Sequence, residues 1–97
     1  MRAKAGQAAR LMKDLANSRR LVILCELWKG ERSVRELEPV VGLSQSALSQ
    51  HLAKLRRGKL VRTRRRSQTI YYSLAHPAVT KVMGALYDVY CRPAARK

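Results

Sequence analysis

The residues of this chain with the most informative chemistry lie between Ser44 and Gln68. A helix predicted from Ser44 to Arg57 has an apolar stripe on one face, formed by Ala47, Leu48, Leu52 and Leu55. The opposite face carries short hydrogen-bonding side chains, namely Gln45, Ser46, Ser49 and Gln50. Side chains of this kind read the edges of base pairs in the major groove of DNA. We therefore expect this face to contact bases, with Ser44 capping the helix so that its N-terminus points at a phosphate.

A dense basic segment follows the predicted reading face. It contains Lys54, Arg56, Arg57, Lys59, Arg62, Arg64, Arg65 and Arg66. The whole chain has a formal net charge of +15, and its acidic residues lie at or before Glu38 except for Asp88. Segregated charge of this size attracts a polyanion over a long range. We expect Lys54, Arg64, Arg65, Arg66 and Gln68 to contact double-stranded DNA together with the reading face.

The two cysteines, Cys25 and Cys91, are the other candidate chemical groups. They are too far apart in the sequence for a CxxC redox motif or a zinc knuckle. From the residues alone, both buried packing and thiol chemistry remain open. The two histidines and two distant cysteines form no evident tetrahedral metal site, so no metal or cofactor is predicted. Paired carboxylates, a phosphate-binding glycine loop and a nucleophile triad are absent from the pattern, which argues against an enzyme.

The elements that must position these groups can be placed from periodicity and capping signals. Helices are expected over residues 3–16, 19–29, 33–41, 44–57 and 77–91, and strands over 60–64 and 69–74, joined by a tip at 65–68. Ser33 and Glu36 form the pattern of a capping box, and Gly42 lies in the turn before Ser44. His51 is expected to pack at the edge of its helix, and Trp28 to lie in the core.

This order of elements (α-α-α-α-β-β-α) predicts a mainly helical domain with a small β-hairpin. We interpret residues 1–97 as a single winged helix-turn-helix domain whose residues 92–97 form a frayed tail. The first and last helices keep apolar faces after the core is built. Pairing them across a two-fold axis would give a homodimer with two reading helices about one DNA turn apart.

The segment from Leu43 to Arg56, followed by Leu60-Val61 and by Ile70 to Leu74, resembles the ArsR/SmtB family of bacterial repressors. This resemblance covers nearly the whole chain and implies a homodimer that represses an operator until an inducer releases it. The chain departs from the family at Gly58-Lys59, where the family's glycine usually directly precedes the leucine. Lys59 is therefore expected to take a positive φ. Metal-sensing members carry Cys-x-Cys near Ser33, where this chain has Ser-Val-Arg.

The positions of Cys25 and Cys91 resemble one branch of that family, the persulfide- and redox-sensing regulators of the BigR, SqrR and HlyU type. The resemblance implies that the two thiols become linked, directly or through sulfur, and that affinity for DNA then falls. We predict a sequence-specific repressor released by reactive sulfur species or oxidants. A metal-responsive repressor and an architectural DNA-binding protein without an inducer are the alternatives. No signal or membrane segment is evident, so a cytoplasmic location is expected.

Overall fold

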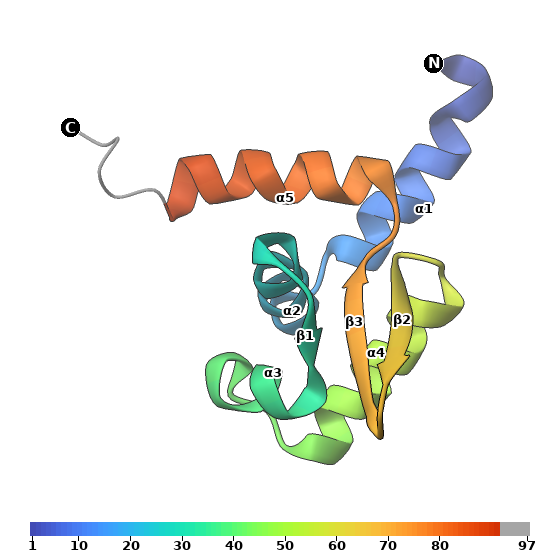
Figure 1. Ribbon diagram of the computed structural model, residues 1–97. Helices are drawn as coiled ribbons and strands as arrows, with labels where there is room; N and C mark the ends of the chain where they lie inside the picture. The colour runs from blue at the N-terminus through green and yellow to red at the C-terminus, as the bar shows by residue number, and fades with distance from the viewer. Residues whose placement is uncertain (92–97) are drawn as a thin grey trace.

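The domain is built from helices that surround one end of a small antiparallel sheet (Figure 1). The computed structural model describes residues 1–91, so the predicted frayed tail lies outside the described residues. The elements in chain order are η1 (Arg2–Lys4), α1 (Ala5–Leu15), α2 (Ser18–Lys29), β1 (Arg32–Ser33), α3 (Val34–Val41), α4 (Gln45–Arg57), β2 (Val61–Arg66), β3 (Thr69–Leu74) and α5 (Pro77–Tyr90). The predicted winged helix-turn-helix order is confirmed, with one strand added.

Polar caps fix where the helices begin, which is why the predicted boundaries are accurate to within two residues. The Asn17 side chain accepts hydrogen bonds from the backbone N–H groups of Arg19 and Arg20 at the start of α2. At the start of α3, Ser33 and Glu36 form the predicted capping box. The first helix differs slightly from the prediction, because residues 2–4 form a 3₁₀ turn before α1 begins.

The sheet has three strands within residues 1–91, in the order β1-β3-β2. Strand β1 was missed in the sequence because two residues are too short to show a period of two. The hairpin also differs from the prediction. Arg65 and Arg66 belong to β2, where they pair with Ile70 and Thr69, so the tip is shorter than the expected 65–68 and turns at Ser67. Ser67 has a φ of 58°, the left-handed conformation that such a tight turn requires.

A leucine-rich core joins the helices to the sheet. Its fully buried side chains are Ile23, Leu24, Leu37, Leu48, Leu52, Val79 and Met83. Helix α2 lies at the centre of this core and packs against α5, β3 and α3. Any displacement of α2 is therefore felt by both the closing helix and the helix-turn-helix unit, since close-packed interiors transmit strain.

The C-terminus of α4 ends in a Schellman motif whose left-handed residue is Lys59. The Leu60 N–H donates to the Leu55 carbonyl at 2.9 Å, and the Lys59 N–H donates to the Arg56 carbonyl at 2.9 Å. Lys59 has a φ of 63°, which confirms the expected positive value. Gly58, one position earlier, has an ordinary φ of −80°. The glycine thus precedes the position where its conformational freedom would be most useful.

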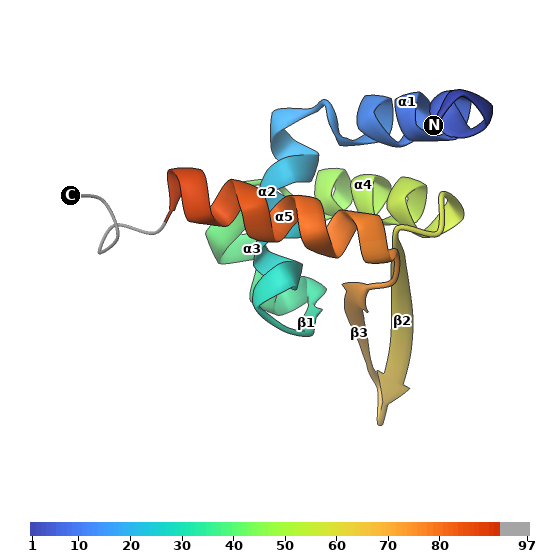
Figure 2. The ribbon, with the colours of Figure 1, turned by 90° about the horizontal axis from the view of Figure 1, so that it is seen from above.

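Helices α1 and α5 lie together on the side of the molecule seen in Figure 2. Large apolar side chains remain exposed on them, with Met12 at 55%, Val89 at 61% and Tyr90 at 78% of their full accessibility. Exposed apolar surface of this kind is typical of an interaction site. Within residues 1–91, no helix is both long and apolar enough to span a membrane.

Candidate DNA interface and dithiol site

The reading face of α4 is exposed as the sequence predicts. Leu48, Leu52 and Leu55 are buried against the core, and this orientation turns the opposite face outward. The side chains on the outer face are all exposed, and they are Ser44, Gln45, Ser46, Ser49, Gln50 and Lys54. The Ser44 hydroxyl accepts a hydrogen bond from the Ala47 N–H at 3.2 Å, so it caps the helix. The first turn of α4 thereby presents backbone N–H groups at an exposed helix end.

The wing formed by β2 and β3 lies at the same end of the molecule as the start of α4 (Figure 1). Arg65, Arg66 and Gln68 are exposed near its tip. Gln45 at the start of α4 and Gln68 at the wing tip line one groove, so the structure relates two groups of predicted contact residues that come from different elements. A helix N-terminus and a basic hairpin that project at one end of the domain can meet a major groove and an adjacent backbone at once.

Arg64 is engaged within the protein. Its guanidinium donates two hydrogen bonds to the Glu31 carboxylate, from Nε to Oε2 at 2.9 Å and from Nη2 to Oε1 at 2.7 Å. This pairing lowers the pKa of Glu31 and raises that of Arg64. The contact of Arg64 with DNA stays a prediction, whereas its partner Glu31 could not be found from the sequence, because the two residues are 33 positions apart and no local pattern links them.

The two cysteines lie in one pocket between α2 and the end of α5. Cys25 is half-buried in the middle of α2, and Cys91 is exposed at the C-cap of α5, where its N–H donates to the Tyr87 carbonyl at 2.8 Å. The pocket has a volume of about 430 Å³ and is mostly apolar. Its other lining residues are Leu21, Val22, Met83, Leu86, Tyr87 and Tyr90. Both cysteines are free thiols.

The surroundings of Cys25 disfavour its thiolate. Burial raises the pKa of Cys25, and a negative charge on Cys91 raises it further. The nearby Cys91 side chain also favours the protonated form of Cys25 and so raises its pKa. The Lys29 ammonium opposes these effects. The two thiols line the same pocket, and the more exposed Cys91 is the better placed to react first with a reagent from solution.

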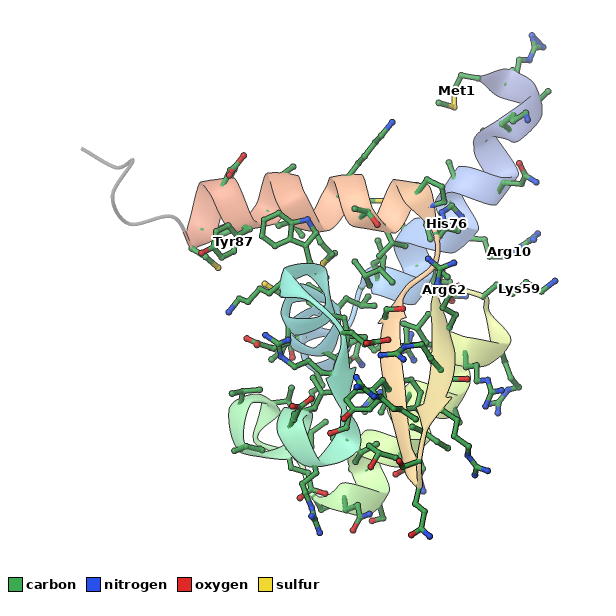
Figure 3. All side chains as sticks on the ribbon, in the orientation of Figure 1. Met1, Arg10, Lys59, Arg62, His76 and Tyr87 are labelled. Atoms are coloured by element: carbon green, nitrogen blue, oxygen red, sulfur yellow. The ribbon has the colours of Figure 1, made fainter. Side chains whose placement is uncertain are left out.

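An aromatic contact braces α2 against α5 beside the thiols. The rings of Trp28 and Tyr87 have centroids 4.9 Å apart, and Figure 3 shows Tyr87 on the side of α5 that faces α2. Gly84 allows the close approach, because a β-carbon there would lie 3.3 Å from Nε1 of Trp28. Trp28 packs partly buried against the core, as expected.

His51 is half-buried on α4, in accord with the expected packed position. Burial lowers the pKa of His51, and the positive charges of Arg20, Lys54 and Arg19 lower it further. The position of His51 on α4 is therefore one where protonation is unfavourable. In the part of the chain that the structure describes, no three His, Cys, Asp or Glu side chains gather in a way that could hold a metal ion.

The fold and these surfaces define a winged helix-turn-helix protein. Residues 17–63 match the model for the bacterial regulatory proteins of the arsR family. The chain is 57% identical to the nodulation protein NolR of Rhizobium meliloti over 86% of this chain and 68% of that protein. It is also similar to the structure of reduced HlyU from Vibrio cholerae, with 48% identity and a TM-score of 0.89 over 95% of this chain and 97% of that one.

A further similar structure is the winged helix-turn-helix domain of Mb0332 from Mycobacterium bovis, described as homodimeric and as a possible ArsR-family regulator. It has 37% identity and a TM-score of 0.76, over 90% of this chain and 81% of that chain. On these matches the chain belongs to the ArsR family, and it is a transcriptional regulator of that family.

Proposed function

We propose that this chain is a homodimeric, operator-binding repressor that releases DNA when Cys25 and Cys91 become covalently linked. The observation that carries the proposal is the apolar pocket between α2 and α5, which both thiols line. Free cysteines are often inert packing residues. Two thiols that share a pocket, one of them exposed, are instead suited to a two-thiol reaction.

The exposed face of α4 and the wing support the DNA-binding part of the proposal. Gln45 and Gln50 can each make two hydrogen bonds to an adenine. Ser46 and Ser49 can hydrogen bond to more than one kind of base and are therefore less selective. Ser44 and Lys54 lie where they can contact phosphates, and Arg65, Arg66 and Gln68 extend the interface along the wing. The net charge of +15 supplies the sequence-independent attraction.

The apolar surface on α1 and α5 supports a homodimer. Met12 on α1 and Val89 and Tyr90 on α5 are exposed, and a second copy would cover them. Mb0332, a similar protein, is described as homodimeric. A two-fold axis through this surface would separate two copies of α4 by about one turn of DNA, or about 34 Å.

The proposed reaction begins at the exposed thiol. The Cys91 thiolate attacks the outer sulfur of an organic persulfide, RSSH, and RS⁻ leaves, which gives a persulfide on Cys91. The Cys25 thiol then loses its proton to solvent and attacks the Cys91 sulfur, and HS⁻ leaves. The two thiols together lose two electrons, and the transferred sulfur gains them as sulfide. A peroxide would instead give a sulfenic acid on Cys91 and then the same disulfide, with water as the by-product.

The link would weaken DNA binding through α2. This helix packs against α5 on one side and against α3 and β3 on the other. A covalent bond between Cys25 and Cys91 changes how α2 and α5 pack, and α5 lies in the proposed dimer interface. Because both half-sites must be met at once, a small change in the angle between protomers lowers the affinity of the dimer sharply.

The test uses the full chain and a duplex selected by the reduced protein from a random pool. Intact mass, free thiol content and duplex affinity are measured before and after anaerobic treatment with an organic persulfide. We expect the loss of two thiols and a large fall in affinity. The Cys25→Ser and Cys91→Ser variants should bind the duplex like the wild type and should keep their affinity after treatment.

Two results would contradict the proposal. Release of DNA from a Cys25→Ser/Cys91→Ser double variant after treatment would show that the thiols are not the switch. A reduced protein that selects no sequence and binds with a steep salt dependence would be the architectural DNA-binding protein of the alternative hypothesis.

A further inference from the structure

The paired side chains of Glu31 and Arg64 connect parts of the fold that are distant in sequence. Glu31 lies between the end of α2 and β1, whereas Arg64 lies in the middle of the wing strand β2. Both carboxylate oxygens accept hydrogen bonds from the guanidinium, at 2.9 and 2.7 Å. A two-point contact between a planar fork and a carboxylate fixes orientation as well as distance, unlike a contact through a single charge.

The sheet register shows what this contact spans. Ser33 of β1 pairs with Tyr71 of β3, and Tyr71 pairs with Arg64 of β2. The guanidinium carbon of Arg64 lies 5.6 Å from the centre of the Tyr71 ring, so the side chain crosses β3 on its way to Glu31. The outermost strand of the wing is thereby tied, over the middle strand, to the segment that leaves α2.

The charge of Glu31 makes its presence here informative. The pairing with Arg64 lowers the pKa of Glu31, so the carboxylate is ionised at neutral pH, and the positive charge of Arg66 acts in the same direction. An ionised acid beside the arginines of a DNA-binding wing weakens the attraction to phosphates. Charge alone therefore predicts that replacing Glu31 by a neutral residue would strengthen DNA binding. Geometry predicts the opposite, because the wing would lose its tie to α2.

We propose that Glu31 is a positioning residue for DNA binding, which acts through Arg64 to hold the wing at the angle that DNA requires. In this assignment Arg64 orients the strand, while Arg65, Arg66 and Gln68 contact the nucleic acid. The inference rests on the proposed contact between wing and DNA, and it is independent of the thiol switch.

The test compares Glu31→Gln with wild type, both fully reduced, by fluorescence anisotropy with the selected duplex over a series of salt concentrations. Glu31→Gln should lower the affinity by about two- to fivefold, the scale expected for a partly exposed ion pair. The slope of affinity against salt should stay the same, because no phosphate contact is lost. Arg66→Gln should instead reduce the slope. Glu38→Gln removes another negative charge from the helix-turn-helix unit and should leave affinity equal or slightly higher.

Arg64→Lys provides the second variant. It keeps the positive charge but cannot make the forked contact, so it should lose as much affinity as Glu31→Gln. Equal or tighter binding by Glu31→Gln, or wild-type binding by Arg64→Lys, would overturn the assignment while leaving the DNA-binding proposal intact. Failure of the wild-type protein to prefer any duplex would overturn both. Thermal unfolding of each variant shows whether the fold is retained.

Discussion

Exchanging the residues at positions 58 and 59 should stabilise the protein. In the Gly58→Lys/Lys59→Gly variant the composition and net charge stay the same, but the glycine occupies the left-handed position of the Schellman motif. Lys59 has a φ of 63°, and Gly58 has a φ of −80° that a lysine adopts without strain. A β-carbon on Gly58 would lie 3.6 Å from the Lys54 carbonyl oxygen, which is an ordinary contact. Lys59 points into solvent, so its side chain leaves no cavity (Figure 3).

The expected gain follows from the backbone alone. A non-glycine residue in the left-handed region costs about 1–2 kcal/mol. Both chains have one glycine at these two positions, so the conformational entropy of the unfolded chain is the same in the variant and the wild type. The free energy of unfolding should rise by about 1–2 kcal/mol. For a domain of this size each kcal/mol raises Tm by about 4–8 °C.

Thermal unfolding followed by circular dichroism measures this change. The variants must be compared at one protein concentration, because dimerisation also raises Tm. Gly58→Ala is the matched control and should gain only about 0.4–1 kcal/mol from reduced flexibility of the unfolded chain. An exchange variant that melts at or below the wild-type temperature would refute the reasoning, since it would mean that Lys59 is unstrained in the native motif.

Three further predictions concern packing, capping and pH. Gly84→Val should lower the free energy of unfolding by about 1–3 kcal/mol, because the added carbons overpack the ring of Trp28; Ala85→Val, on the exposed side of α5, should not. Ser33→Ala should cost about 1–2 kcal/mol in denaturant unfolding, whereas Ser33→Thr keeps the cap and should cost less. The pKa of His51 is lowered by folding, so the unfolded chain binds more protons and stability should fall as pH drops below 6.5. A stability profile that keeps the same pH dependence in His51→Gln would contradict this.

The helical part of the fold was predictable because its signals are local. The side chains of Asn17 and Ser33 bond to backbone groups within three residues, so the sequence alone contains both partners. The apolar stripe of α4 likewise determines which face is exposed, and Gln45 and Gln50 lie on it as expected. The left-handed Lys59 was predictable from the family resemblance, because Lys59 occupies the position before Leu60 where the family usually has glycine.

The wing was harder to predict because arginine occurs in both strands and turns, so a run of arginines does not show where a strand ends. Arg65 and Arg66 were assigned to the tip, but pairing with β3 extends the strand through them. The Glu31–Arg64 contact and the Cys25–Cys91 pocket depend on how distant segments pack. The family resemblance implies that the two thiols become linked, and the crossing of α2 and α5 brings both to one pocket.

The position of Trp28 gives the molecule a built-in optical probe. It is the only tryptophan of the chain, and its ring contacts Tyr87, which also lines the pocket that holds both thiols. When tryptophan is excited selectively, all of the protein's fluorescence therefore comes from the contact between α2 and α5. Unlabelled protein in a cuvette can accordingly report events at its thiols in real time, before any DNA is added.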